Sequence, residues 1–158
     1  MRYKIVFGLL VTSILGANEL QIKANSFNAD ENTGLSVFSG NVNIKKQNDE
    51  LNASTVSVYT NKNNEPIKYV AVGNVSFVIQ TKQASIYRGE AGKVIYMPET
   101  KEYHFFKNVH LRQVDQKKEI IGDEVVLKTV EGKAYAKGVK SEPVIMIFNI
   151  SDENSTKE

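Results

Sequence analysis

One pattern occurs three times in this sequence: Phe38-Ser39-Gly40-Asn41-Val42-Asn43-Ile44, Ala71-Val72-Gly73-Asn74-Val75-Ser76-Phe77 and Phe105-Phe106-Lys107-Asn108-Val109-His110-Leu111. Each copy reads apolar, any residue, Gly or Lys, Asn, Val, any residue, apolar. The repeated valines are 33 and 34 residues apart, a spacing typical of stacked supersecondary units. Ala136-Lys137-Gly138-Val139 is a weaker candidate for a fourth copy.

Short runs rich in Val, Ile, Tyr, Phe and Thr alternate with clusters of Asn, Gly, Asp and Lys, and no stretch has helical periodicity. The pattern predicts an all-β chain with strands at 20–24, 35–45, 51–60, 67–80, 83–88, 93–97, 102–113, 119–128, 132–140 and 143–150. Turns are expected at 28–34, 47–50, 61–66, 98–101, 115–118 and 131–132.

Successive residues of a strand point to opposite faces of the sheet. The repeated valines and the residues two positions away therefore share one apolar face. Its members are Phe38, Val42, Ile44, Tyr69, Ala71, Val75, Phe77, Ile79, Tyr103, Phe105, Val109 and Leu111. The opposite face holds mainly Ser39, Asn41, Asn43, Asn74, Ser76, His104, Asn108 and His110. Several long strands with one apolar face each predict two sheets or a folded ribbon around an apolar interior, which is either a filled core or an open groove.

The N-terminus has the features of a secretory signal peptide, with a basic start at Arg2 and Lys4, an apolar run from Ile5 to Leu15 and small residues up to Ala17. An uncleaved anchor is the alternative, although the run is short for a membrane span. We expect a signal peptide at 1–17, one domain at 18–150 and a disordered polar tail at 151–158.

Charge and composition exclude several classes of function. Without Arg2 and Lys4, 18 of the 20 basic residues remain against 18 acidic ones, so the mature chain lacks the basic surface of a nucleic-acid binder. The chain has no cysteine, which excludes disulfides, thiol chemistry and cysteine metal sites.

No catalytic or metal-binding constellation is evident. The two histidines, His104 and His110, are predicted to lie about 20 Å apart on one strand, too far to share a metal ion. The acid pairs at 30–31, 49–50 and 123–124 are most simply solvated charges, and no nucleophile elbow, P-loop or dinucleotide motif occurs. We therefore expect no enzyme and no cofactor. Lys45-Lys46 and Lys117-Lys118 are either ordinary loop charges or partners for lipid phosphate.

The Gly-Asn-Val units, the export signal and Gln113-Val114-Asp115 followed by Ile121-Gly122-Asp123 resemble the OstA-like family over residues 19–147. Lys107 departs from the pattern, because it replaces the glycine of the other copies. The resemblance implies an open, twisted β-jellyroll and a periplasmic protein that carries lipopolysaccharide to the outer membrane. It also implies head-to-tail homo-oligomers that bridge an inner-membrane LptC-like protein and an outer-membrane LptD-like protein.

This reading assigns two sets of functional residues. Acyl chains are expected to contact Ile22, Phe38, Val42, Ile44, Val56, Val58, Val75, Phe77, Phe105, Val109 and Leu111. Terminal strands with unpaired backbone groups are expected to join neighbouring molecules through Leu20, Ile22, Ala24, Val144, Ile145, Ile147 and Ile150.

Two alternatives remain open at this point. A membrane-anchored LptC-like subunit of the same pathway would keep its N-terminal segment, whereas a soluble carrier would have a mature N-terminus at Asn18. A structural β-repeat module with a filled core would release no lipid when the purified protein is extracted.

Overall fold

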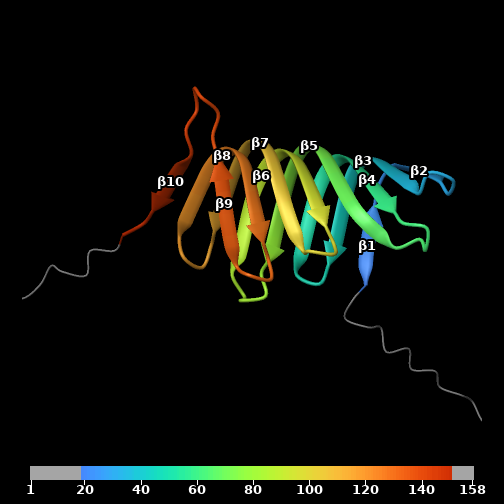
Figure 1. The fold of residues 1–158 in the computed structure, drawn as a ribbon, viewed down its shortest axis with the longest axis horizontal. Coiled ribbons are helices and arrows are strands. Elements are labelled where there is room, and N and C mark those ends of the chain that lie inside the picture. The colour runs from blue at the N-terminus through green and yellow to red at the C-terminus, as the bar shows by residue number, and fades with distance from the viewer. Residues whose placement is uncertain (1–18, 151–158) are drawn as a thin grey trace, which may run out of the picture.

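The structure is a computed structural model that describes residues 19–150, so the predicted signal peptide and polar tail lie outside it. The described chain is all-β, as predicted, and forms one open antiparallel sheet (Figure 1). Its strands are β1 (Leu20–Lys23), β2 (Ser26–Asp30), β3 (Leu35–Lys46), β4 (Asp49–Thr60), β5 (Pro66–Gln80), β6 (Ile86–Met97), β7 (Glu102–Gln113), β8 (Lys118–Lys128), β9 (Lys133–Lys137) and β10 (Ile145–Phe148).

The sheet is a meander in which β3 to β8 pair in sequence order. Each end of the sheet carries two short strands. At one end β1 and β2 both pair with β3, and at the other end β9 and β10 both pair with β8. These two ends lie at opposite sides of the molecule in Figure 1.

Each copy of the repeat forms a β-bulge. Six residues at the bulges have backbone φ in the left-handed region: Gly40 (82°), Asn41 (46°), Gly73 (90°), Asn74 (44°), Lys107 (66°) and Asn108 (50°). In each copy these two residues lie opposite a single residue of the next strand, which is Ser54, Gly92 or Asp123. Because an inserted residue bends its strand, the bulges bend neighbouring strands at the same level.

The row of bulges divides the sheet into two walls. Half-sheet A comprises residues 26–30, 35–39, 55–60, 66–72, 93–97, 102–106, 124–128 and 133–137. Half-sheet B comprises residues 20–23, 42–46, 49–53, 75–80, 86–91, 109–113, 118–122 and 145–148. Figure 1 shows the strands running over the bend and ending in turns at the lower side of the molecule.

The sequence prediction divided β6 into two strands. Residues 83–88 and 93–97 were expected as separate strands, but β6 runs without a break through Gly89 and Gly92. A side chain at Gly89 would place its Cβ 2.1 Å from the His110 carbonyl oxygen and 2.9 Å from the Phe77 ring. The glycines therefore mark a close approach of neighbouring groups within the strand.

The prediction also missed β2, because Asn28, Ala29 and Asp30 were read as part of a turn. Pairing with residues 35–39 overrides their weak strand preference. The prediction of a fourth copy of the repeat at residues 136–139 was wrong as well. Gly138 has no left-handed φ, β9 ends at Lys137, and residues 138–144 leave the sheet before β10.

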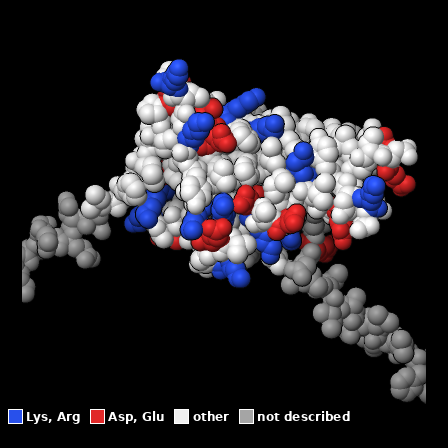
Figure 2. All heavy atoms as spheres, viewed as in Figure 1, with Lys and Arg blue, Asp and Glu red and all other residues white. Residues whose placement is uncertain are grey.

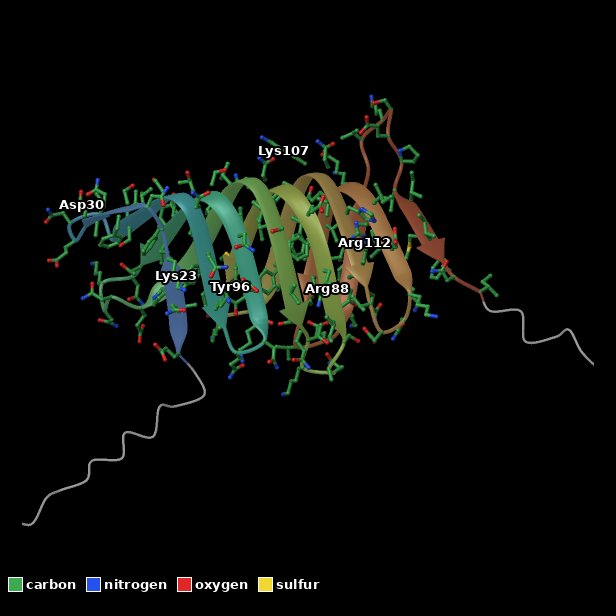
Figure 3. All side chains as sticks on the ribbon, turned by 180° about the vertical axis from the view of Figure 1, so that it is seen from behind. Lys23, Asp30, Arg88, Tyr96, Lys107 and Arg112 are labelled. Atoms are coloured by element: carbon green, nitrogen blue, oxygen red, sulfur yellow. The ribbon has the colours of Figure 1, made fainter. Side chains whose placement is uncertain are left out.

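Lys107, labelled at the upper side of the sheet in Figure 3, keeps the bulge geometry although it carries a side chain, with a φ of 66°. A non-glycine residue in this conformation costs about 1 kcal/mol or more. Lys107→Gly should therefore raise the free energy of unfolding by about 0.5–1 kcal/mol, since the flexibility of glycine in the unfolded chain offsets part of the gain. Chemical denaturation measures this difference.

Gly73→Ala is the matched control and should have the opposite sign. Its φ is 90°, and the added Cβ would lie 2.7 Å from the Ser54 Oγ. We expect a loss of about 1–2 kcal/mol. A lower stability for Lys107→Gly would show that the left-handed conformation at this position is not the source of strain.

Candidate functional site

The apolar faces of the two half-sheets pack against each other. Phe77 of half-sheet B stacks on Phe105 of half-sheet A with ring centroids 4.4 Å apart, and the two residues are 3% and 0% exposed. Val109, Leu111 and Val125 beside them are fully buried. The middle of the interior is therefore a filled core.

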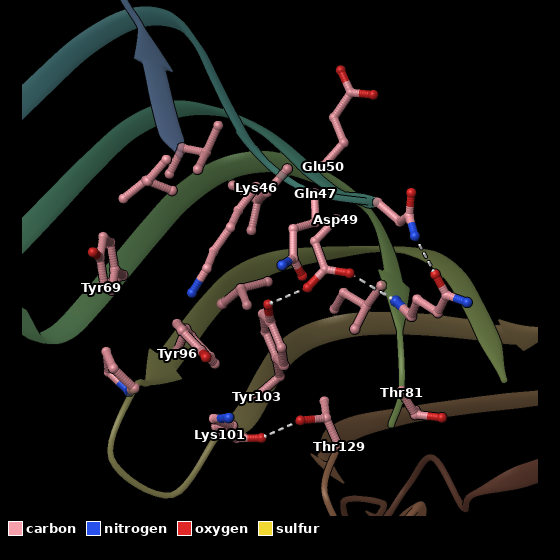
Figure 4. A pocket seen from close by; sticks show the side chains of 18 of the residues that line it. Lys46, Gln47, Asp49, Glu50, Tyr69, Thr81, Tyr96, Lys101, Tyr103 and Thr129 are labelled. Atoms are coloured by element: carbon pink, nitrogen blue, oxygen red, sulfur yellow. Dashed lines mark hydrogen bonds between the residues drawn. The ribbon is translucent and has the colours of Figure 1, made fainter. Parts of the chain in front are cut away.

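A cavity of about 570 Å³ opens between the half-sheets on the side of the N-terminal strands, and we name it the N-side cavity (Figure 4). This volume lies within the usual range for ligand sites. Its apolar wall consists of Leu20, Ile44, Leu51, Val56, Tyr69, Ala71, Ile79, Val94, Tyr96 and Tyr103. Its polar lining includes Lys46, Gln47, Asn48, Asp49, Glu50, Thr81, Lys82, Lys101 and Thr129.

A second cavity of about 540 Å³, the C-side cavity, lies toward the other end of the sheet. Tyr87, Leu111, Ile120, Ala134, Met146 and Phe148 contribute to its lining, together with Gln83, Gln113, Lys118 and Glu131. The interior therefore combines a packed middle with two hollows. The sequence left a filled core and an open groove as alternatives, and the structure has features of both.

A short contact between two turns lies at the boundary of the two cavities. The Lys82 backbone N–H donates to the Thr129 carbonyl at 3.1 Å, and the Gln83 side-chain amide donates to the Val130 carbonyl at 2.6 Å. Lys82 and Thr129 line the N-side cavity, whereas Gln83 lines the C-side cavity. We name this contact the turn latch, because it joins half-sheet B to half-sheet A where the two cavities meet.

Aromatic rings form a continuous row along the inner wall. The ring centroids of Tyr69 and Tyr96 lie 6.0 Å apart, those of Tyr96 and Tyr103 4.4 Å apart, and those of Tyr103 and Phe105 6.0 Å apart. The last two pairs are stacked, whereas the rings of Tyr69 and Tyr96 are tilted by 40°. The row leads from the N-side cavity into the core.

Asp49 is the carboxylate inside the N-side cavity. It accepts hydrogen bonds from the Gln80 backbone N–H at 2.8 Å and from the Tyr103 hydroxyl at 3.4 Å. Burial raises the pKa of Asp49, although these two bonds and the charge of Lys46 act in the opposite direction. Burial and then the charge of Asp49 hold the pKa of Tyr103 well above its usual value, so its hydroxyl stays protonated and able to donate.

The structure places the predicted acyl-contact residues on the inner face. Ile44 and Val56 line the N-side cavity, and Leu111 lines the C-side cavity. The others lie in or against the core: Ile22, Phe38, Val42, Val58, Val75, Phe77, Phe105 and Val109. Ile22 and Phe38 in this second group are half-buried, whereas a ligand could reach its fully buried members only if the half-sheets moved apart.

Sequence reasoning did not nominate several cavity residues. Tyr69, Ala71, Ile79 and Tyr103 were placed on the apolar face but not among the expected contacts. Leu51, Val94, Tyr96, Lys82 and Lys101 also line the N-side cavity. The alternation of faces along each strand could have identified the apolar residues. It could not have identified Lys82 and Lys101, because both are in turns.

The predicted edge residues lie in or beside the terminal strands. Leu20 and Ile22 belong to β1, with Ala24 just after it, while Ile145 and Ile147 belong to β10, with Val144 and Ile150 flanking it. At both ends large apolar side chains are exposed, including Leu20, Phe27, Tyr135, Ile145, Met146, Ile147 and Phe148.

Within residues 19–150, no group of three histidine or acidic side chains could hold a metal ion. His104 lies 3.3 Å from Glu102, and His110 lies 2.8 Å from Glu119. In Figure 2 basic and acidic groups lie next to each other along the lower border. No helix in the described part of the chain is long and apolar enough to cross a membrane.

Comparison with known proteins agrees with this architecture. Solved structures that match include LptH, described as the LptA-homologous periplasmic component of the lipopolysaccharide transport device of Pseudomonas aeruginosa. It has 15% sequence identity and a TM-score of 0.74, and the match covers 84% of this chain and 96% of that one, which supports the jellyroll fold. No curated protein sequence matches the chain.

The match to a protein family is more informative. The model of the family described as LptA/(LptD N-terminal domain) LPS transport protein matches residues 21–133, which is most of the domain. The resemblance expected from the repeat is confirmed, and the chain belongs to the family of LptA and the LptD N-terminal domain, which are lipopolysaccharide transport proteins.

Proposed function

We propose that this protein is a periplasmic carrier that takes lipopolysaccharide to the outer membrane by holding its acyl chains between the two half-sheets. The observation that carries the proposal is the N-side cavity, which has an aromatic and aliphatic wall and an open polar rim. Membership of a lipopolysaccharide transport family supplies the ligand class. A cleavable signal peptide at residues 1–17 would deliver the chain to this compartment.

The free energy gained by burying an acyl chain exceeds the free energy of the hydrogen bonds in the turn latch. Burial of one methylene group is worth about 0.8 kcal/mol, so a chain of twelve to fourteen carbons gains on the order of 10 kcal/mol. Each hydrogen bond of the turn latch contributes only about 1 kcal/mol. An acyl chain could therefore break the latch, and it would connect the two cavities into one groove if the packed core around Phe77 and Phe105 also rearranged.

The chemistry of the interior suits carriage without catalysis. Its polar groups, such as Asp49 and Tyr103, bond to each other. The family is one of transport proteins. Directional movement of lipid would then depend on partners, which we propose to be an LptC-like protein at the inner membrane and an LptD-like protein at the outer membrane.

The ends of the sheet suit a bridge of several copies. Each end has one short strand in half-sheet A and one in half-sheet B, and the outer edges of these strands are unpaired among residues 19–150. If β10 of one copy added to β1 of the next, and β9 to β2, both walls would continue across the junction. Contact between unlike ends propagates into an open row.

Lipid contact should follow strand parity. Phe77 and Phe105 lie on the inner face, whereas their neighbours Ser76 and Phe106 lie on the outer face and are half-buried. A photo-crosslinking phenylalanine derivative should trap lipopolysaccharide several-fold more efficiently at 77 and 105 than at 76 and 106. Gel shifts of the crosslinked protein measure this ratio, and equal yields at all four positions would contradict the proposed groove.

Filling the N-side cavity should weaken binding. Ala71 is 3% exposed and pairs with Val56 and Val94 in the cavity wall. Ala71→Phe would place a ring in the space for the acyl chain, at a cost of about 1–3 kcal/mol of stability. We expect about a tenfold loss of lipopolysaccharide affinity in a fluorescence displacement titration.

Val70→Phe is the control for this variant, because it adds a ring at the next position on the outer face. It should bind lipopolysaccharide like the parent protein. A folded Ala71→Phe variant with parental affinity would exclude the N-side cavity as an acyl site.

Association through β10 can be tested with proline. The Asn149 N–H donates to the Lys117 carbonyl. By the alternation of antiparallel pairs, Ile147 therefore faces β8, and the Met146 backbone faces outward. Met146→Pro removes a free edge donor and should reduce association at least several-fold in light scattering across a concentration series.

Ile147→Pro removes a donor from the ladder between β8 and β10, so it should lower the thermal stability of the monomer more than Met146→Pro does. A Met146→Pro variant that associates like the parent, or a parent that stays monomeric throughout the series, would contradict strand addition at this edge.

A further inference from the structure

Three lysines line the N-side cavity: Lys46, Lys82 and Lys101. All three are exposed, and none takes part in the salt bridges found among residues 19–150. They come from three different segments, namely the end of β3 and the turns that follow β5 and β6. The fold therefore brings three lysines, distant in sequence, into the lining of one apolar hollow.

Strand register explains how one of these lysines comes to face inward. Lys46 pairs with Leu20 of β1 and with Asp49 of β4, and both partners line the same cavity. In Figure 4 the Lys46 side chain extends toward Tyr96, and Lys101 lies beside Thr129. The ammonium group of Lys46 thus lies near the aromatic part of the wall.

The cavity lining contains fewer inward carboxylates than lysines. The Glu50 side chain points away from the cavity in Figure 4, where it accepts a hydrogen bond from Asn43 at 2.8 Å and pairs with Lys45 at 3.6 Å. Asp49 accepts hydrogen bonds from Gln80 and Tyr103 and also interacts with the charge of Lys46. The cavity lining therefore has three lysines and a single inward carboxylate.

The C-side cavity has a different balance of charge. Its lining contains one lysine, Lys118, and one acid, Glu131. Lys118 already donates to the Gln116 side chain at 2.6 Å and lies over the Phe148 ring, 5.9 Å from its centroid. An excess of free positive charge therefore distinguishes the N-side cavity from the C-side cavity.

We infer that Lys46, Lys82 and Lys101 form a phosphate site at the rim of the N-side cavity, for an amphiphile whose acyl chain occupies the apolar wall. The inference rests on the proposed carrier function and specifies its ligand class as a phosphorylated lipid. Ammonium groups are point-charge partners for phosphate. The lysines would set the orientation of the lipid, with its phosphate at the rim and its chain directed along the aromatic row.

The test is calorimetric titration of the full-length mature protein with dodecyl phosphate and with an uncharged dodecyl glycoside, both below their micelle-forming concentrations. Dodecyl phosphate should bind at least tenfold more tightly. Each lysine near an anionic group contributes on the order of fivefold in affinity, so Lys46→Gln, Lys82→Gln and Lys101→Gln together should abolish the difference.

A matched triple variant controls for net charge. Lys68→Gln, Lys93→Gln and Lys137→Gln remove the same charge elsewhere; Lys68 and Lys93 lie over the Tyr59 and Phe106 rings on the outer face. This variant should keep the preference for dodecyl phosphate. An equal loss of preference in both triple variants would reduce the effect to net charge and overturn the site.

The remaining outcomes separate the inference from the carrier function. Equal affinity of the parent for both amphiphiles would overturn the phosphate site and leave acyl binding intact. If neither amphiphile bound, the carrier function would fail at this cavity, and the site with it. Inorganic phosphate should compete no better than chloride at equal ionic strength, and binding of inorganic phosphate as tight as that of dodecyl phosphate would overturn a site shared with an acyl chain.

Discussion

The whole architecture depends on a row of residues held in the left-handed backbone region at one level of the sheet. Strands of eleven to fifteen residues would otherwise form a broad sheet with one exposed apolar face. The bulges at Gly40, Gly73 and Lys107 bend these strands together, and the bend turns that face inward on itself. Burial of apolar area then stabilises both halves at once, at roughly 25 cal/mol per Å².

A folded sheet of this kind is closed at the bend and open on the opposite side, along the turns. Its two walls are covalently joined along the bend, whereas along the turns they meet through contacts such as Lys82 with Thr129 and Tyr103 with Asp49. Core packing near Phe77 and Phe105 resists separation, but the hydrogen bonds between the walls are few and individually weak. The interior can therefore be both a stabilising core and a site that a long apolar ligand enters.

The sequence predicted the features that follow from a periodic pattern, such as the inner face of each strand. It did not predict the features that depend on tertiary contacts. The repeat and strand parity placed Val42, Val75 and Val109 inside, because a period of two is dictated by the pleat. β2 was missed because its residues prefer turns and pair only through tertiary context. The prediction broke β6 between residues 88 and 93, where Gly89 and Gly92 lie, but the close approach of a neighbouring backbone explains Gly89 within a continuous strand. Lys82 and Lys101 converge only through the folding of the sheet, a relation that one sequence without a structure does not contain.

Each end of the sheet has a strand in both half-sheets, so strand addition at an end would extend both walls of the bend. If the bend had produced two separate sheets, strand addition at one end would extend only one wall. Here β1 and β2 continue the two halves on one side, and β9 and β10 do so on the other. Each junction could then preserve the angle between the walls, because all four short strands belong to one bent sheet. A groove that holds an acyl chain in one copy would meet an equivalent groove in the next, so the same left-handed residues that create the interior would also align it along a row of molecules.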